Sequence, residues 1–242
     1  MTETNPVNGG ISKLALVGYG KMGRLLEQLA PEFGFAVALK LDEFNNVDGA
    51  GITSENFAGI DVAVDFSIPP VVAANVERIA PLGVNVVIGT TGWADDLPRV
   101  RSAVENAKIG LVYGANFSVG VLAFYEVVRA AAQTMLTQTD YDAWAYEVHH
   151  KMKKDAPSGT MLRILDVMKS AGYSRNIDVG TNRVGTFPGI HEIGFDSEAD
   201  TITLTHTARS RIGFARGALR AARWIRGKDG LHEFSSIWRQ VE

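Results

Sequence analysis

The chain has 242 residues, of which 46% are hydrophobic and 21% charged, an ordinary composition for a globular protein. The net charge of −3 gives no support for nucleic acid or an anionic membrane surface as a partner. Without cysteine the chain has no disulfides, thiolate metal sites or cysteine nucleophiles. Residues 2–10 are predicted to be a flexible tail without a signal-peptide pattern, and no apolar run approaches the ~18 residues of a membrane span. We therefore expect a cytoplasmic location.

The first fifty residues alternate between strand and helix patterns around a glycine-rich turn. Apolar runs predict strands over residues 13–17 and 35–39, and the spacing of leucines predicts a helix over 24–30. Between the first strand and the helix, residues 18–23 carry the motif G-x-G-x-x-G. This order, followed by an acidic residue at Asp42, is typical of a dinucleotide-binding unit.

The three glycines of this motif have separate physical roles in such a unit. Gly18 allows a sharp backbone turn, Gly20 leaves room for a pyrophosphate, and Gly23 lets the helix pack closely on the strand. The motif alone is a weak signal, since a tight turn also uses glycine. The strand before it, the helix after it and the acidic residue in register favour the cofactor interpretation.

Asp42 is the expected ribose ligand. Its carboxylate can accept hydrogen bonds from an adenosine ribose, which favours NAD. Glu43 and Asp48 are alternative candidates for this role, and an ordinary surface aspartate is an equally good interpretation of Asp42. Lys40 keeps a ribose 2′-phosphate possible, so the choice between NADH and NADPH stays open.

The alternation continues through residue 113. Strands are predicted over residues 61–66, 85–88 and 109–113, with helices over 69–80 and 95–107. Strands alternating with helices indicate a Rossmann-like, doubly wound parallel sheet, which binds its ligands at the carboxyl ends of the strands. The residues that follow strands in this way are Ser67, Gly89, Thr90, Thr91, Gly114, Ala115, Asn116 and Phe117.

The pattern changes after residue 118. Helices are predicted over residues 121–132 and 162–168, and a strand over 143–148. Strict alternation over residues 201–206 predicts a half-covered, antiparallel strand. These elements indicate a smaller α+β domain with an open mixed sheet.

An amphipathic helix over residues 214–225 is expected to pack back on the first domain. The predicted domains are therefore a discontinuous dinucleotide-binding domain, residues 1–118 and 214–242, and a substrate-binding and tetramerisation domain, residues 119–213.

The densest group of ionisable side chains in the second domain lies between residues 147 and 160. His149, His150 and Lys153 are the plausible acids, and cationic side chains also hold carboxylates. Asp155 is interpreted as a helix cap rather than as a partner that orients a lysine. A metal site is disfavoured, because neighbouring residues on a strand point to opposite faces and no third ligand stands out. On charge alone, the alternative is a solvated basic loop before an ordinary helix that starts near Pro157.

The chain resembles the 4-hydroxy-tetrahydrodipicolinate reductase (dihydrodipicolinate reductase) family over nearly its whole length. Its most specific motif is His-His-x-x-Lys-x-Asp-Ala-Pro-Ser-Gly-Thr, residues 149–160, preceded by Glu147. The other matching segments are residues 18–23, 64–67, 89–92, 116–120, 183–185, 189–191 and 205–215.

The resemblance implies hydride transfer from NADH or NADPH to a cyclic, unsaturated dicarboxylate in lysine and diaminopimelate biosynthesis. It implies His149 as a catalytic acid or charge stabiliser and Lys153 as the proton donor; which of the two delivers the proton stays open. The implied substrate positions are His150, Ser158, Gly159 and Thr160. The implied cofactor positions are Gly18, Gly20, Lys21, Met22, Gly23, Asp42, Ser67, Gly89, Thr90, Thr91, Gly114, Ala115, Asn116 and Phe117.

The resemblance also implies a homotetramer built through the sheet of the second domain, with hinges at Phe117–Ser118 and Arg211. The segment between residues 170 and 183 is shorter than in longer members, which leaves the oligomer size open. Ile68 stands where many members carry an arginine, and Glu43 follows Asp42 in place of a basic residue, which tilts the expectation toward NADH. Whether the enzyme itself expels the 4-hydroxyl group is open.

Two rival functions fit parts of the sequence. One is a related dehydrogenase acting on an amino or imino acid, against which the motif of residues 149–160 argues. The other is a catalytically silent NAD-sensing protein, which would bind the cofactor but would not need the cluster of acids.

Overall fold

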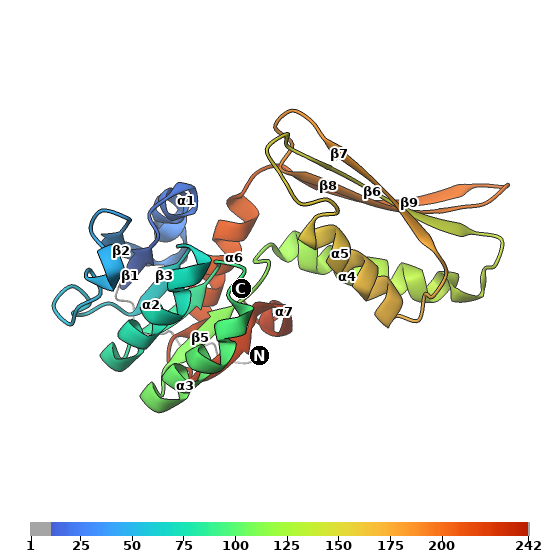
Figure 1. Ribbon diagram of the computed structural model, residues 1–242. Helices are drawn as coiled ribbons and strands as arrows, with labels where there is room; N and C mark the ends of the chain where they lie inside the picture. Colours follow the sequence, from blue (N-terminus) through green and yellow to red (C-terminus); the bar gives the residue numbers. More distant parts are fainter. Residues whose placement is uncertain (1–10, 242) are drawn as a thin grey trace. The chain divides into compact units, whose positions relative to one another are not determined.

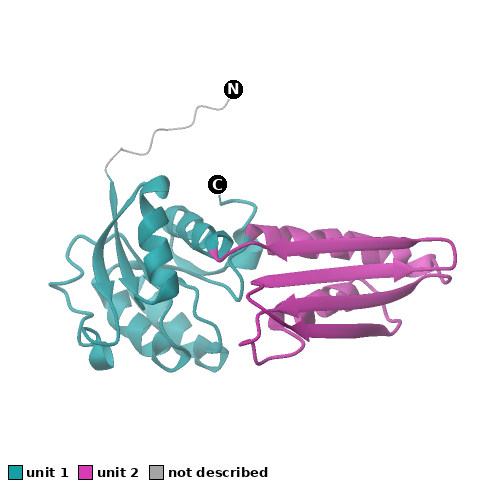
Figure 2. Cartoon of the chain, turned by 90° about the horizontal axis from the view of Figure 1, so that it is seen from above, with its two compact units in different colours: residues 1–118, 212–242 teal, residues 119–211 magenta. Residues whose placement is uncertain are grey.

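The computed structural model describes residues 11–241, so the predicted tail over residues 2–10 lies outside the described residues (Figure 1). The chain divides into two compact units (Figure 2). The first unit consists of residues up to 118 together with those from 212 onward, and the second is the continuous segment 119–211.

The first unit contains a sheet of six parallel strands in the order β10-β5-β4-β3-β1-β2. The strand β3 is buried along its whole length, and its neighbours β4 and β5 are buried except at one end residue, as expected of a parallel sheet covered on both faces. The order reverses between β1 and β3, which is where an open α/β sheet binds its ligand. The strands are β1 (Ser12–Val17), β2 (Phe35–Leu41), β3 (Val62–Asp65), β4 (Asn85–Ile88), β5 (Gly110–Tyr113) and β10 (Gly230–Glu233).

Helices cover both faces of this sheet, so the predicted Rossmann-like fold is confirmed (Figure 1). The first and sixth helices pack together, as do the second and third. The sixth helix buries one apolar stripe in the first unit, as its amphipathic pattern predicted. The helices are α1 (Lys21–Leu29), α2 (Val72–Ile79), α3 (Leu97–Ala107), α6 (Ile212–Ile225) and α7 (Phe234–Ile237), with short 3-10 turns at Ala30–Phe33, Val47–Gly49, Pro69–Val71, Ala80–Leu82 and Ala94–Asp96.

The second unit is a four-stranded mixed sheet with two helices on one face, which confirms the predicted α+β class (Figure 2). The strand order is β7-β6-β8-β9, and only the pair β6 and β7 is parallel. Apolar residues of the helices and the sheet form one core, which includes Val128, Met161, Ile164 and Phe195. The elements are α4 (Val119–Thr134), the 3-10 turn Met135–Thr137, β6 (Asp142–His149), α5 (Gly159–Ser170), β7 (Ile177–Arg183), β8 (Gly189–Asp196) and β9 (Thr201–Ala208).

The helical segment Val119–Thr137 is 19 residues long with a hydropathy of 1.2, so by length and composition it could cross a membrane. The sequence analysis expected no such segment. Phe124, Val128 and Ala132 of this helix nevertheless belong to the core that it forms with the sheet. A core helix of a globular protein passes the same test, so the finding is weak support for a membrane span.

Candidate active site

The glycine turn after β1 has a backbone that only glycine adopts easily. Gly18 has a φ of +90°, and a Cβ atom there would lie 2.4 Å from the carbonyl oxygen of Phe66. A Cβ on Gly23 would lie 2.7 Å from the carbonyl oxygen of Gly18. Both contacts are backbone contacts that no side chain can relieve, so the turn, β3 and α1 need these two glycines to pack together.

Gly20 differs from its two neighbours in the motif. It stands at the N-cap of α1, and a Cβ atom there would meet no atom within 4 Å. The glycine at this position is therefore not required by packing within the first unit. The amino end of α1, which begins at Lys21 and continues through the half-buried Met22, is a place where backbone N–H groups can bind a phosphate.

A buried carboxylate organises the carboxyl ends of β3 and β4. The Oδ1 atom of Asp65 accepts hydrogen bonds from the N–H and the hydroxyl of Ser67, at 2.8 and 2.6 Å, and from the Thr90 hydroxyl at 3.3 Å. Its Oδ2 atom accepts one from Asn75 at 2.9 Å. Burial raises the pKa of Asp65, and these hydrogen bonds oppose the increase. Both hydroxyls point to Asp65, and the N–H of Gly89 donates to the Asp65 carbonyl oxygen at 2.9 Å, so these groups hold the edge of the sheet together.

Asp42 follows the last residue of β2 and is held by its own loop. Its Oδ1 atom accepts hydrogen bonds from the N–H groups of Phe44 and Asn45 at 2.9 and 3.2 Å. The ammonium group of Lys40 lies 3.0 Å from Glu27 and 5.1 Å from the centre of the Tyr19 ring. Lys40 is thus already paired with an acid, which weakens the argument that it waits for a 2′-phosphate.

The segment after β5 combines an exposed loop with a buried anchor. Asn116 accepts a hydrogen bond from the N–H of Ser118 at 2.8 Å, while Ala115 and Thr91 are exposed. Phe117 is only 2% exposed, and its ring lies 4.5 Å from that of Phe234. Phe117 therefore packs in the core of the first unit, and only its backbone and the preceding residues from Gly114 on can face a ligand.

In the second unit, strand register brings together residues that are far apart in the sequence. Glu147 on β6 pairs with His191 on β8, and His149 pairs with Arg183 on β7. His191 in turn pairs with His206 on β9. Alternate residues of a strand share a face, so Glu147 and His149 point the same way, toward the side covered by the helices.

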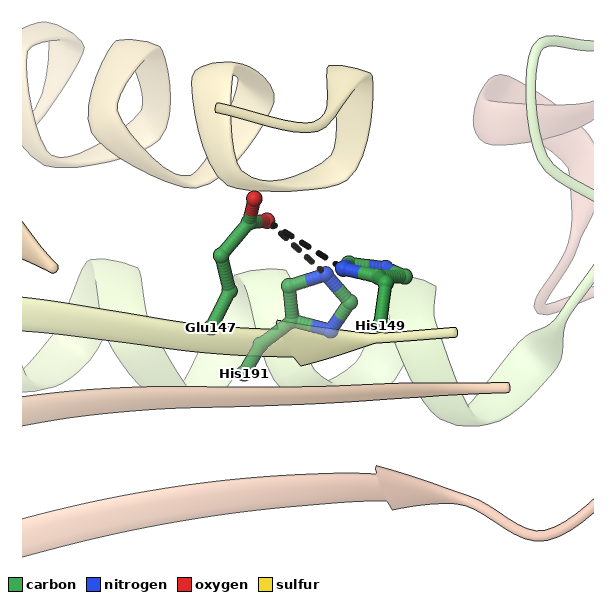
Figure 3. Close-up of side chains that lie close together, drawn as sticks. All are labelled: Glu147, His149 and His191. Carbon is green, nitrogen blue, oxygen red and sulfur yellow. Dashed lines mark ion pairs between the residues drawn. The ribbon is translucent and has the colours of Figure 1, made fainter. Parts of the chain in front are cut away.

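Glu147 is the centre of this cluster, and its side chain is fully buried. Its Oε1 atom accepts hydrogen bonds from the N–H of Ser158 at 2.9 Å and from Arg183 at 2.6 Å. Its Oε2 atom accepts one from the Ser158 hydroxyl, and it lies 3.7 Å from Nδ1 of His149 and 3.8 Å from Nε2 of His191. Figure 3 shows both imidazole rings turned toward this carboxylate.

Burial and charge set the protonation states in the cluster. Burial acts to raise the pKa of Glu147, but hydrogen bonds from Ser158 and Arg183 outweigh it and the pKa is lowered. Burial lowers the pKa of His149, and for His191 burial and the neighbouring His149 lower the pKa to about 4. The cluster at neutral pH is therefore a carboxylate beside two neutral imidazoles.

The loop after β6 carries the remaining predicted residues of this site. The ammonium group of Lys153 lies 2.9 Å from Oδ1 of Asp155, and its side chain is 25% exposed. The hydroxyl of Ser158 accepts a hydrogen bond from the N–H of Met161, so Ser158 is the N-cap of α5. The interpretation of Asp155 as the N-cap is wrong, because Ser158 occupies that position. The Asp155 carboxylate pairs with Lys153 and also interacts with the backbone N–H of Gly159, and both lower its pKa, with Lys153 the larger cause. The half-buried His150 is the first residue after β6, and Lys153 donates its N–H to the His150 carbonyl at 3.0 Å.

Gly159 and Thr160 are the first two residues of α5. They lie directly after the capping serine, where helix N–H groups have no partner within the helix. A Cβ atom on Gly159 would meet no atom within 4 Å, so there is room at this position for a ligand. A carboxylate is the natural occupant of such a site.

Glu147, His149 and His191 could also hold a metal ion, since their ligand atoms lie within 4.8 Å of one another. The sequence pattern disfavours a metal site at His149 and His150, because no third ligand stands out in it. However, both oxygens of Glu147 already accept hydrogen bonds from Ser158 and Arg183. A cation would have to displace these bonds beside the positive charge of Arg183, so we interpret the cluster as a hydrogen-bonding centre.

Three residues of the cluster are not among the predicted site residues, although they lie in the segments that carry the family resemblance: Glu147, Arg183 and His191. For Glu147 a local signal existed, because it precedes His149 by two residues on a strand and must share its face. For Arg183 and His191 the signal lies in strand pairing, which the sequence does not display.

Comparisons with known proteins identify the family of the chain. A family model described as "Dihydrodipicolinate reductase, N-terminus" matches residues 12–117, and one described as "Dihydrodipicolinate reductase, C-terminus" matches residues 120–237. The 4-hydroxy-tetrahydrodipicolinate reductase of Christiangramia forsetii is 33% identical over 235 residues, which cover 93% of this chain and 96% of that protein. The enzyme of the same name from Neisseria gonorrhoeae is 32% identical over 267 residues, with the same coverage.

A solved structure shares the fold. The dipicolinate-bound dihydrodipicolinate reductase from Paenisporosarcina sp. TG-14 aligns with a TM-score of 0.76 and 20% sequence identity, over 94% of this chain and 99% of that chain. The two family models together match most of the chain, and the relatives agree in name. The chain therefore belongs to the dihydrodipicolinate reductase family of NAD(P)H-dependent oxidoreductases.

Proposed function

We propose that this chain reduces 4-hydroxy-tetrahydrodipicolinate, by way of dihydrodipicolinate, to tetrahydrodipicolinate in lysine and diaminopimelate biosynthesis. The nicotinamide supplies a hydride to the unsaturated ring, and the protein supplies one proton. The relatives that span almost the whole chain carry the name of this activity. The observation that carries the proposal at the level of residues is the position of Lys153 and His149 just before the amino end of α5, where a carboxylate can bind.

Lys153 is the proton donor in this proposal. Its ammonium group is held in place by an ion pair with Asp155 at 2.9 Å and is partly exposed, so it can reach a ligand. Burial lowers the pKa of His149, which makes its ring a poor source of protons at neutral pH. We assign His149 to contact with the reacting ring.

The dicarboxylate is bound by His150, Ser158, Gly159 and Thr160 in this proposal. The N–H groups at the start of α5 receive one carboxylate, and the positive end of the helix dipole favours its charge. Ser158 acts through its backbone position, because its hydroxyl is already bound to Glu147. His150 contacts a part of the ligand away from the reacting atoms.

The cofactor is NADH or NADPH, bound at the carboxyl edge of the first unit's sheet. The pyrophosphate lies on the turn from Gly18 to Gly23, and the adenosine ribose bonds to the Asp42 carboxylate. The remaining contacts come from Ser67, Gly89, Thr90, Thr91, Gly114, Ala115, Asn116 and Phe117. Because Lys40 is paired with Glu27 and Glu43 follows Asp42, we expect NADH to be used at least as well as NADPH.

We also propose a cytoplasmic homotetramer without a nucleic-acid or membrane partner. The second unit's sheet has one face without covering helices, which includes Trp144, Tyr146 and Thr203. On this face the Trp144 and Tyr146 rings lie over Gly194 and Gly180, where a Cβ atom would approach within 2.1 and 2.8 Å. Such a flat face with packed aromatic rings suits pairing with a second copy of the chain.

The experiment that tests this function follows the oxidation of NADH at 340 nm with freshly generated 4-hydroxy-tetrahydrodipicolinate. Turnover of this compound, with no turnover of an open-chain imino acid, supports the proposal. Turnover of the imino acid instead would identify a related amino-acid dehydrogenase. Tight cofactor binding without any turnover would identify a nucleotide-sensing protein.

A further inference from the structure

We propose that Glu147 is a positioning residue that holds the ring proton of His149 on Nδ1 and fixes the start of α5, so that both face the ligand in one arrangement. This inference rests on the proposed function for its effect on turnover. The inferred tautomer of His149 and the inferred fixing of α5 do not depend on that function. Glu147 touches neither substrate nor cofactor in this proposal and acts only through His149 and Ser158.

Glu147 is a buried acid on a strand whose preceding buried residues are apolar. The Glu147 side chain has no exposed surface, and a carboxylate in that position is costly unless hydrogen bonds and charges compensate for it. Two bonds from Ser158 and one from Arg183 do so. A buried core position would be filled more cheaply by an apolar residue, as Ala143 and Ala145 do on the same face of β6. Placing an acid here therefore needs a reason beyond packing.

Glu147 also holds the start of the helix that is proposed to bind the ligand. Ser158 gives its N–H to Oε1 and its hydroxyl to Oε2 of the same carboxylate. The same hydroxyl accepts the N–H of Met161 and lies 3.3 Å from Nε2 of His191. Glu147 thus fixes both the position and the hydroxyl orientation of the cap, and with them the direction of the N–H groups of Gly159 and Thr160.

The Glu147 carboxylate also faces the ring of His149. A carboxylate can only accept hydrogen bonds, so the ring nitrogen that faces it is the one that carries the proton. Nδ1 of His149 lies 3.7 Å from Oε2 and has no hydrogen-bond partner among the residues that the structure describes. With the proton on Nδ1, the Nε2 atom is an acceptor. It lies beside Gly189, where a Cβ atom would come within 3.1 Å of it, so glycine leaves it room.

The groups around His149 together favour a neutral imidazole ring at this position. Glu147 and Asp155 favour a protonated ring, whereas Lys153 and Arg183 oppose it, and burial opposes it most. The ring of His191 lies edge-on to that of His149, with 5.0 Å between the two ring centres. Since the ring stays neutral, only the tautomer decides whether Nε2 donates or accepts, and Glu147 is the group that decides it.

The first test needs no substrate. Nitrogen-15 NMR of the whole enzyme at pH 7.5 distinguishes protonated from bare ring nitrogens, and the chain has five histidines, so assignment through single His→Gln variants is practical. We expect His149 to carry its proton on Nδ1, and the variant Glu147→Gln to lose this preference. A wild-type His149 with its proton on Nε2 would overturn the proposal.

The second test measures turnover and binding. Glu147→Gln is expected to lower kcat by about tenfold or more, to weaken dipicolinate binding, and to leave the dissociation constant for NADH unchanged. The control variant Glu198→Gln removes a charge from the exposed turn between β8 and β9 of the same unit and should match the wild type. Equal kcat in Glu147→Gln and the wild type would reject the positioning role.

Two outcomes separate this proposal from the proposed function. A wild-type enzyme with the expected tautomer but no reductase activity would reject the function and keep the positioning of His149. If Glu147→Gln fails to fold, as judged by circular dichroism, Glu147→Asp replaces it. The shorter side chain keeps the charge but cannot reach Ser158 and His149 together, so we expect a lower kcat with an unchanged NADH dissociation constant; a kcat equal to that of the wild type would reject the role.

Discussion

The backbone N–H of Gly18 donates a 2.9 Å hydrogen bond to the carbonyl oxygen of Leu41, and the N–H of Tyr19 donates to the same oxygen at 3.0 Å. These bonds fix the glycine turn beside the end of β2. The residue after Leu41 is Asp42, so the two ends of the proposed cofactor site, for the pyrophosphate and the ribose, are held at a constant separation by the backbone itself.

Gly20→Ala should separate folding from cofactor binding. A Cβ atom at Gly20 meets nothing within 4 Å, so the variant should have the melting temperature of the wild type to within about 2 °C. It should nevertheless weaken NADH binding at least about tenfold, because the methyl group occupies the space of the pyrophosphate. Calorimetric titration measures this. Gly18→Ala is the matched contrast, since its backbone clash with Phe66 should destabilise the fold as well.

The coenzyme preference should depend on Asp42. We expect a Michaelis constant for NADH no higher than that for NADPH, because a carboxylate repels a 2′-phosphate and Lys40 is occupied by Glu27. Asp42→Ala should raise the constant for NADH and lower that for NADPH. Side-by-side measurements that strongly favour NADPH in the wild type would contradict this interpretation.

Lys153→Ala should abolish turnover while leaving nucleotide binding near normal. The loss removes the proton donor, an effect of about 100-fold or more in kcat. Lys154→Ala is the matched control, since Lys154 is the exposed neighbour with the same charge. Reduction of the substrate by Lys153→Ala at the rate of the control would exclude Lys153 as the donor.

Stability should fall as the pH decreases from about 6.5 toward 4. The pKa of His191 is lowered by burial and by His149 from 6.5 to about 4, so in this window the unfolded chain binds a proton that the folded chain does not. The stabilisation is complete above pH 6.5 and is lost as the pH falls through the folded pKa, at a cost of at most about 3 kcal/mol. Urea denaturation at pH 7.5 and 5.0 measures the slope, which His191→Gln should reduce. Below pH 4.5, protonation of Glu147 adds a loss of the same sign, since its pKa is lowered by the hydrogen bonds from Ser158 and Arg183.

Thr203→Arg should dissociate the proposed tetramer. Thr203 is exposed on the uncovered face of the sheet and pairs with Gly194 beneath the Trp144 ring. A buried, unpaired guanidinium in a subunit interface is costly, whereas on a monomer it is solvated. Sedimentation velocity should show a smaller species than the wild type. Thr137→Arg, at an exposed position outside the sheet, should sediment as the wild type does.

Local patterns predicted the parallel sheet and the longer helices, since these segments show an apolar run or a clear period. The strand over residues 61–66 and the helix over 95–107 were predicted within a few residues, with errors at the ends where 3-10 turns replace the α-helix. Four elements were not predicted: the strands β7, β8 and β10 and the helix α7. None of them carries an uninterrupted apolar run, and each of the three strands forms because a neighbouring strand offers it a partner.

The site was only partly accessible to the same reasoning. The motif of residues 149–160 identified the loop and the helix start, because its members are neighbours in sequence. Glu147 on β6 contacts Arg183 on β7 and His191 on β8. These residues meet only because the three strands pair in one particular register, which the sequence does not display. The interpretation of Asp155 failed for a similar reason. Both Asp155 and Ser158 are good capping residues, and only the position of Lys153 and Glu147 decides between them.

The pairing of β10 with β5 has a consequence for the order in which the chain is made. The first unit cannot complete its sheet until residues 230–233 leave the ribosome, because α6 and β10 follow the whole second unit in the sequence. The second unit is continuous and can fold while synthesis continues. We therefore expect that a nascent chain stopped after residue 211 holds a folded second unit and an open, aggregation-prone edge at β5, and that a chain of full length closes this edge last.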